Sequence, residues 1–247
     1  MFGHFAGMSQ VVHDIRTITL DLDDTLWAIA PVIARAEQRL RDWYGVHYPR
    51  VPERFPQADT LDLRQQVIAR HPERAHDLTF QRRELMRSMA AESGYHQFDV
   101  DAAFAVFEKA RNEVSLYPDV RPVLQVLHDH YTLIAVTNGN ASLDKIGIAD
   151  LFDDYICARD VGAAKPARRI FAAAVEAGGA SAAETLHVGD HPEIDIEGAR
   201  AAGLATAWMN RAGMMWPAEF SAPTVTITDL HQLDQMLAAA RQNGRMP

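Results

Sequence analysis

Three carboxylates at positions 21, 23 and 24 directly follow a run of apolar and β-branched residues. The run has the composition of a buried strand, and side chains alternate between the two faces of a strand. Asp21 and Asp23 are therefore expected on one side of the strand end, with Asp24 on the other. Two acids that share one site repel each other unless a cation or a shared proton offsets the repulsion. The pair predicts a metal, and hard oxygen ligands beside a substrate phosphate suit Mg²⁺.

Other polar residues follow three further strand-like runs. They are Thr137, Asn138, Lys165, Asp190 and Asp195. Each alone is ordinary, because Thr and Gly-Asp at strand ends are typical of turns and a single lysine in a loop is usually solvated. Together they supply an anion clamp, a fixed cation and a second pair of acids. This combination is what phosphoryl transfer needs in one place.

The elements that carry these residues alternate along the chain. Short apolar runs predict strands at 15–20, 131–137, 156–158, 185–188, 205–209 and 224–227, and helical periodicity lies between them. This alternation predicts an α/β fold with a Rossmann-like, doubly wound parallel sheet that helices cover on both faces. Ligands bind beyond the carboxyl ends of such strands, so the polar residues are expected to meet at one edge.

Residues 28–116 interrupt this pattern with helical periodicity alone. Apolar residues three or four apart predict four helices, near 33–43, 61–68, 80–89 and 101–114. The proline-rich stretch 49–57 is predicted to be a loop. We therefore expect two domains, a core of residues 1–27 and 117–247 and an all-helical insert of residues 28–116.

Composition restricts the partners and the compartment. The formal charge of −9 over 247 residues argues against a nucleic-acid or anionic membrane surface, but a small anionic partner such as a phosphorylated metabolite stays open if positive charge is local. Cys157 is the only cysteine, so neither a disulfide framework nor a thiolate metal cluster is expected. No apolar run approaches the roughly 20 residues of a membrane span, and no export signal is evident. We expect a cytoplasmic monomer or homodimer.

The order of the motifs resembles that of the haloacid dehalogenase superfamily. Phosphatases of that superfamily carry Asp-x-Asp-x-Thr, a Ser or Thr, a Lys, and a Gly-Asp with a further Asp. The matching residues are Asp21-Leu-Asp23-Asp24-Thr25, Thr137, Lys165-Pro166, and Gly189-Asp190 with Asp195. The helical insert is also similar to the C1-type cap of the superfamily. The resemblance extends from residue 18 to about residue 210.

The resemblance implies a two-step hydrolysis. Asp21 would attack phosphorus as the nucleophile and form an aspartyl phosphate, and a carboxylate needs no base for this because it is ionised at neutral pH. Asp23 would protonate the leaving oxygen and then take a proton from the attacking water. It must hold a proton when substrate arrives, which its anionic neighbours favour.

The resemblance also implies the ligands of the metal and of the phosphate. Mg²⁺ would be held by the Asp21 carboxylate, the main-chain carbonyl of Asp23 and Asp190. The Thr137 hydroxyl and the backbone amide of Asn138 would bind phosphate, and Lys165 would neutralise both phosphate and Asp21. Asp195 is expected to orient Lys165 or a water on the metal.

Four stretches are similar to the bacterial flavin mononucleotide (FMN) phosphatases of riboflavin metabolism: residues 20–26, 31–33, 136–141 and 186–190. This finer resemblance implies FMN or a phosphorylated riboflavin precursor as substrate. Trp27, Trp43 and Tyr44 are then candidates to stack on a flat ring. Other substrates stay open, namely phosphoglycolate, a sugar phosphate or a nucleoside monophosphate.

Three alternatives compete with the phosphatase hypothesis. The first, 2-haloacid dehalogenase activity, is disfavoured because dehalogenases of the superfamily lack an acid at the place of Asp23. A signalling receiver domain also phosphorylates an aspartate, but it is smaller and has no helical insert. A binding protein that lost turnover is disfavoured because every expected catalytic residue type is present.

Overall fold

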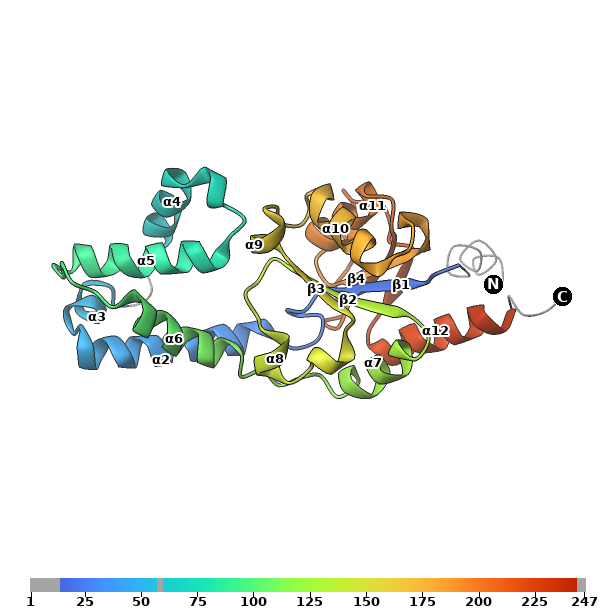
Figure 1. The fold of residues 1–247 in the computed structure, drawn as a ribbon, viewed down its shortest axis with the longest axis horizontal. Helices are drawn as coiled ribbons and strands as arrows, with labels where there is room; N and C mark the ends of the chain where they lie inside the picture. Colours follow the sequence, from blue (N-terminus) through green and yellow to red (C-terminus); the bar gives the residue numbers. More distant parts are fainter. Residues whose placement is uncertain (1–13, 57–59, 244–247) are drawn as a thin grey trace.

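The computed structural model describes residues 14–56 and 60–243. Its centre is a parallel sheet with the strand order β3-β2-β1-β4-β5-β6 (Figure 1). The strands are β1 (Thr17–Leu20), β2 (Thr132–Thr137), β3 (Asp154–Cys157), β4 (Thr185–Gly189), β5 (Ala205–Met209) and β6 (Val225–Ile227). This order confirms the predicted doubly wound sheet. Because β1 pairs with β2 on one side and β4 on the other, its carboxyl end lies between theirs.

Helices cover both faces of the sheet, as predicted. Helices α7 (Val120–His128) and α12 (Leu230–Asn243) lie on one face, and α10 (Arg168–Gly178) and α11 (Gly198–Ala201) lie on the other (Figure 1). The shorter elements are α8 (Leu143–Ile146), α9 (Ala158–Val161), a π-helix (Pro192–Glu197) and three 3₁₀ turns (Pro72–Arg74, Ala149–Leu151 and Ala182–Glu184). Burial on both faces explains why these strands are nearly continuous apolar runs rather than alternating ones.

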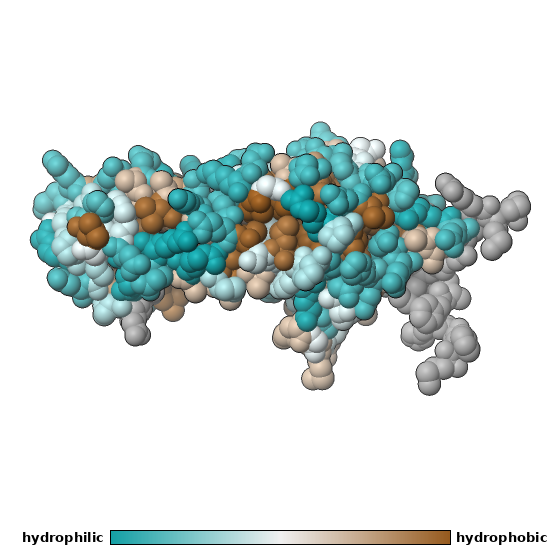
Figure 2. Space-filling view, turned by 90° about the horizontal axis from the view of Figure 1, so that it is seen from below, coloured by the Kyte–Doolittle hydropathy of each residue, from teal (hydrophilic) through white to brown (hydrophobic). Residues whose placement is uncertain are grey.

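Between β1 and α7 the chain forms the helical insert, which contains α2 (Ile29–His47), α3 (Arg50–Arg54), α4 (Leu61–Arg70), α5 (Leu78–Glu92) and α6 (Val100–Arg111). Most of its buried side chains form a cluster of their own, and Val32 of α2 belongs instead to the main cluster at the sheet. Hydrophilic residues cover most of the insert on the face in Figure 2, and hydrophobic ones gather nearer the middle of the molecule. The division into two domains stays a prediction, which the separate cluster supports.

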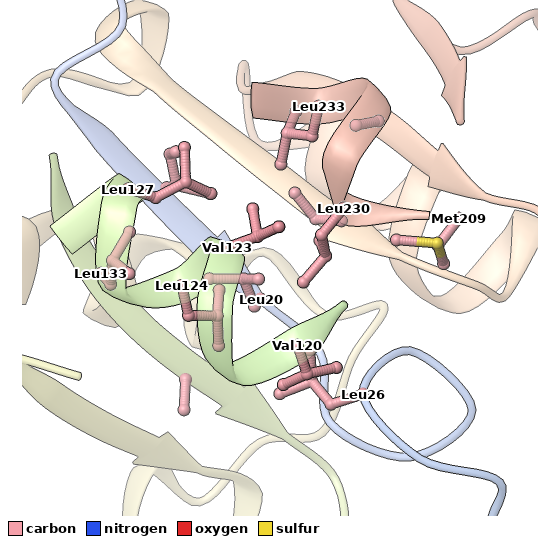
Figure 3. Packing of buried hydrophobic residues seen from close by; sticks show 14 of the residues in the cluster. Leu20, Leu26, Val120, Val123, Leu124, Leu127, Leu133, Met209, Leu230 and Leu233 are labelled. Atoms are coloured by element: carbon pink, nitrogen blue, oxygen red, sulfur yellow. The ribbon is translucent and has the colours of Figure 1, made fainter. Parts of the chain in front are cut away.

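The main hydrophobic cluster fills the space between the sheet and helices α7 and α12. Figure 3 shows α7 side chains packed against those of α12 and against Leu20 of β1. Val120, Leu124 and Leu127 of α7 are fully buried, since apolar residues recur at three to four positions along this helix. This packing holds β1 in place and so fixes the position of the residues that follow it.

The prediction of a loop at residues 49–57 is wrong where the structure describes this stretch. Residues Arg50–Arg54 form the short helix α3. Pro49 precedes its first turn and Pro52 lies in the first turn, where a missing N–H costs little because such groups have no partner within the helix. Val51 is completely buried and attaches the turn to the insert.

Two further observations concern the compartment and the cysteine. Within the described residues, no helix is long and apolar enough to cross a membrane. Cys157 is buried at the end of β3, and its thiol donates to Asp160 at 3.0 Å. Burial raises the pKa of this thiol.

Candidate active site

The turn after β1 places the carboxylates of Asp21, Asp23 and Asp24 in different environments. The Asp21 amide continues the ladder by donating to the Val188 carbonyl at 2.9 Å, and its side chain is buried. Asp24 has a φ of +59°, a left-handed conformation that Asp tolerates better than most residues. Its carboxylate accepts from the Ile29 amide at 2.9 Å at the start of α2. Asp24 therefore holds the turn, and Asp21 and Asp23 are left for chemistry.

Lys165 lies at the centre of a buried ion cluster. Its ammonium donates to Asp21, to Asp195 at 2.7 Å and to the Val136 carbonyl at 3.1 Å. Burial disfavours a charged lysine, but the two carboxylates raise the pKa of Lys165 above its ordinary value. Burial likewise disfavours ionised Asp195, yet Lys165 and His187 hold the pKa of Asp195 well below its usual range.

The loop that carries Lys165 is held by the side chain of Asn138, a residue expected only to bind phosphate. Asn138 accepts from the Lys165 amide at 2.7 Å and donates to its carbonyl at 2.9 Å. An amide side chain offers both an acceptor and a donor, so it can pair with the N–H and the C=O of one residue. Asn138 therefore joins the end of β2 to the Lys165 loop.

Beside this loop, Thr137 and Gly139 form a tight polar corner. The Thr137 hydroxyl accepts from the Gly139 amide at 2.8 Å, and its own proton can be donated elsewhere. A Cβ atom at Gly139 would lie 3.0 Å from Asp23 Oδ2, 3.1 Å from Thr137 Oγ1 and 3.2 Å from Arg111 Nη2. The side chains of Asp23, Thr137 and Arg111 thus lie close to Gly139, which has no side chain of its own to clash with them.

Asp23 has two donors that the sequence reasoning missed. Arg111 Nη2 contacts its two oxygens at 2.8 and 2.7 Å, and Trp27 Nε1 donates to Oδ1 at 2.9 Å. Burial raises the pKa of Asp23, while Arg111 and Trp27 lower it. The main cause of the raised pKa is therefore burial, rather than the anionic neighbours that were expected. The separation of four residues between Asp23 and Trp27 could have indicated their contact, but nothing in the sequence links Arg111 to Asp23.

The expected aromatic stacking on substrate is wrong for two of its three residues. Trp27 is completely buried with its N–H on Asp23, and Tyr44 is 3% exposed. Trp43 packs against the rings of Tyr44, His47 and Tyr48 within the insert. Helical spacing places Trp43 and Tyr44 in the packed interior of the insert, whereas Trp27 precedes α2 and packs in the main cluster.

The acids fit a hard divalent cation. Ligand atoms of Asp21, Asp190 and Asp195 all lie within 4.8 Å of one another. Burial, together with repulsion from Asp195 and Asp24, raises the pKa of Asp190 to about 7, and burial raises that of Asp21 against the opposing effect of Lys165. A cation between these oxygens would offset that repulsion, and oxygen donors of this kind suit Mg²⁺ or a similar ion.

A cavity of about 420 Å³ extends from Asp23 into the helical insert. Arg111 and Gly139 line its inner end, and Ile33 and Phe107 are among the apolar residues around it. Leu61 and Ile68 of α4 are 64% and 41% exposed, and both line this cavity. A second cavity of about 480 Å³ lies beside residues 138–145 and reaches neither Asp21 nor Asp23, so the first is the better candidate for a leaving group.

Comparison with known proteins identifies close similarities. The family model for haloacid dehalogenase-like hydrolases matches residues 15–203. The 5-amino-6-(5-phospho-D-ribitylamino)uracil phosphatase YigB of Escherichia coli K12 is 31% identical over 199 residues, 79% of this chain and 83% of that protein. Pyrimidine 5'-nucleotidase YjjG of the same organism is 37% identical over 126 residues, 49% of this chain and 56% of that one. A crystal structure described as 2-haloacid dehalogenase from Pseudomonas syringae pv. Tomato DC3000 is 35% identical with a TM-score of 0.84, and the match covers 91% of this chain and 99% of that one.

Proposed function

This chain belongs to the haloacid dehalogenase-like hydrolase family and is an enzyme of its phosphatase type; we propose that it hydrolyses a small phosphate monoester through an aspartyl phosphate on Asp21. The observation that carries the proposal is the pair formed by Asp21, beside Lys165, and Asp23, at the inner end of the cavity. Such a pair supplies a nucleophile and a proton donor for the leaving oxygen.

In the first step, an Asp21 oxygen attacks phosphorus, the bond from phosphorus to the ester oxygen breaks, and Asp23 gives that oxygen its proton. In the second step, water attacks phosphorus, Asp23 takes a proton from the water, and the bond from phosphorus to Asp21 breaks. Free phosphate is released and both aspartates return to their starting state. Asp23 is suited to hold the first proton because burial raises its pKa.

The remaining polar residues bind and orient the phosphate. The Thr137 hydroxyl and the backbone N–H of Asn138 would donate to phosphate oxygens, and Lys165 would offset the charge of phosphate and Asp21. Asp195 positions Lys165 through the 2.7 Å contact. Asp21, Asp190 and the Asp23 carbonyl would hold Mg²⁺, which when bound supplies the positive charge that lets an anionic phosphate approach an anionic nucleophile.

We propose FMN or a phosphorylated riboflavin precursor as the substrate. Two observations support this choice: the similarity to YigB over most of both chains, and a cavity that has apolar walls beyond a polar inner end. With Trp27 and Tyr44 buried, a flat ring would pack against residues such as Ile33 and Phe107 instead. Phosphoglycolate, sugar phosphates and nucleoside monophosphates are the alternative substrates.

The similarity to the Pseudomonas syringae structure favours 2-haloacid dehalogenase as a second candidate function. In that reaction Asp21 would displace a halide, which leaves as an anion and needs no proton. That reaction would need neither the acid at position 23 nor the further carboxylates near Asp21. The presence of Asp23, Asp190 and Asp195 around Asp21 favours phosphate chemistry.

The test measures phosphate release from FMN, phosphoglycolate, a sugar phosphate and a nucleotide, and chloride release from 2-chloropropionate, with Mg²⁺ and with EDTA. We expect metal-dependent phosphate release with FMN preferred, and a loss of at least about 10³-fold in Asp21→Asn. Even activity over all the phosphates would reject the flavin substrate and keep the mechanism. Chloride release that is unaffected by EDTA, without phosphate release, would establish the dehalogenase instead.

A further inference from the structure

Arg111 connects the helical insert to the catalytic aspartates. It is the last residue of α6, it is 2% exposed, and its Nη2 contacts both oxygens of Asp23. Its other terminal nitrogen, Nη1, is buried and has no hydrogen-bond partner among the residues that the structure describes. A buried charged donor without an acceptor is unfavourable. Because Arg111 lines the cavity, a ligand in that cavity can supply the missing acceptor.

The contacts of Asp23 determine which part of a substrate would meet Arg111. To protonate the ester oxygen, Asp23 must come within roughly 2.6–3.2 Å of that oxygen. Arg111 Nη2 lies 2.7 and 2.8 Å from the same carboxylate, so the guanidinium stands next to the ester oxygen. Thr137 lies on the phosphate side of this corner, whereas Arg111 belongs to the insert, on the side of the leaving group.

On the leaving-group side, the ester oxygen is bonded to the ester carbon. A substituent on the carbon next to that one lies within one hydrogen-bond length of the ester oxygen. An oxygen in that place, as in a polyol, is an acceptor for Nη1–H. A hydrogen in that place leaves Nη1 buried and unpaired, and sites built to bind a polar group discriminate strongly against analogues that lack it.

We propose that Arg111 is a specificity-determining residue, whose Nη1–H binds an oxygen on the carbon next to the ester carbon. The enzyme thereby selects phosphate esters of polyols over those of simple alcohols. This inference rests on the proposed phosphatase function and deepens it, since a ribityl phosphate carries a hydroxyl at that carbon.

Glycerol 3-phosphate and propyl phosphate test this directly, because they differ only in the hydroxyls of the leaving group. We expect the wild-type enzyme with Mg²⁺ to favour glycerol 3-phosphate in kcat/KM by about tenfold or more. In Arg111→Met this ratio falls to about two or less, because glycerol 3-phosphate loses its contact and propyl phosphate has none to lose. The control Arg121→Met removes an exposed arginine paired with Asp150 and leaves the ratio unchanged.

A structural role alone would give a different result. If Arg111 only supported the fold or the orientation of Asp23, Arg111→Met would lower kcat/KM for both substrates by the same factor, and the unchanged ratio would overturn the inference. Arg111→Lys keeps a cation beside Asp23 without the planar fork, and it is measured in the same way in case the Met variant does not fold; its ratio is expected between the other two.

Failure of the inference differs from failure of the proposed function. Wild-type turnover of both esters at equal kcat/KM would reject the role of Arg111 while phosphatase activity stands. Absence of phosphate release from these esters and from FMN, phosphoglycolate, the sugar phosphate and the nucleotide would reject the phosphatase function, and the inference with it.

Discussion

At the scale of single residues, Asp190 is an acid whose protonation changes near neutral pH. Burial and the nearby carboxylates of Asp195 and Asp24 raise its pKa to about 7. A raised pKa means that the folded protein holds a proton here that the unfolded chain has already released. Stability is therefore expected to fall as pH rises from about 4 to about 7, through the window between the two pKa values.

A divalent cation replaces that proton, so Mg²⁺ binding should depend on pH. At pH 6 most Asp190 is protonated and binding should release close to one proton, whereas at pH 8 it should release almost none. Calorimetric titration in two buffers with different ionisation enthalpies measures this release. Asp190→Asn is the control, because it has no proton to lose. Equal heats in both buffers at pH 6 would show that Asp190 does not hold the metal.

At the scale of elements, the turn after β2 brings the core and the insert together around Gly139. Thr137, Asp23 and Arg111 all approach the position that a Cβ atom would occupy, at 3.0 to 3.2 Å. Such distances are shorter than ordinary van der Waals contact, so a methyl group must push at least one of the three aside. The glycine is required by this close approach and not by a positive φ.

Gly139→Ala should therefore impair catalysis more than it impairs folding. Because displacement of catalytic groups by about 1 Å can cost about 10²-fold, the smaller displacement here is expected to lower kcat/KM by up to that factor, with a small change in melting temperature. Gly45→Ala is the matched control: it lies within α2, has nothing within 4 Å of its Cβ position, and should stabilise the helix by about 0.5–1 kcal/mol. Equal activity of the two variants would show that the corner at Gly139 is not part of the site.

The sequence predicted most elements because period and composition determine them locally. The strands and long helices agree within a few residues, whereas α3 was missed because prolines were interpreted only as loop residues. The positions of Asp21 and Lys165 were predictable from strand ends. The contact between Arg111 and Asp23 was not, since it joins residues 88 positions apart and a helical pattern does not say what a polar residue meets.

At the scale of the whole molecule, the hydrophobic interior is divided. The cluster of the insert contains Leu85, Met86 and Phe107, and it shares no buried member with the cluster beneath the sheet. Polar contacts such as the one between Arg111 and Asp23 join the two parts. Because cooperativity follows contiguous packing, the insert and the sheet are expected to open as separate units.

Hydrogen exchange of two truncation variants tests this separation. Met86→Ala and Leu124→Ala each remove a fully buried side chain, and each is expected to cost about 2–5 kcal/mol. Met86→Ala should accelerate exchange in α2, α5 and α6 and leave β1, β2 and β4 protected, and Leu124→Ala should accelerate exchange in the sheet. Uniform acceleration throughout the chain in both variants would mean that the molecule opens as one unit.

The buried thiol of Cys157 has a practical consequence for following such movements. A thiol that is 3% exposed, with a raised pKa, reacts slowly with maleimides. Because it is the chain's only cysteine, a new cysteine at an exposed position would be labelled selectively without removal of the native one. Val46 of the insert and Met215 of the core are 77% and 91% exposed, so fluorophores attached to this pair of positions would report a change in the distance between them as a change in energy transfer.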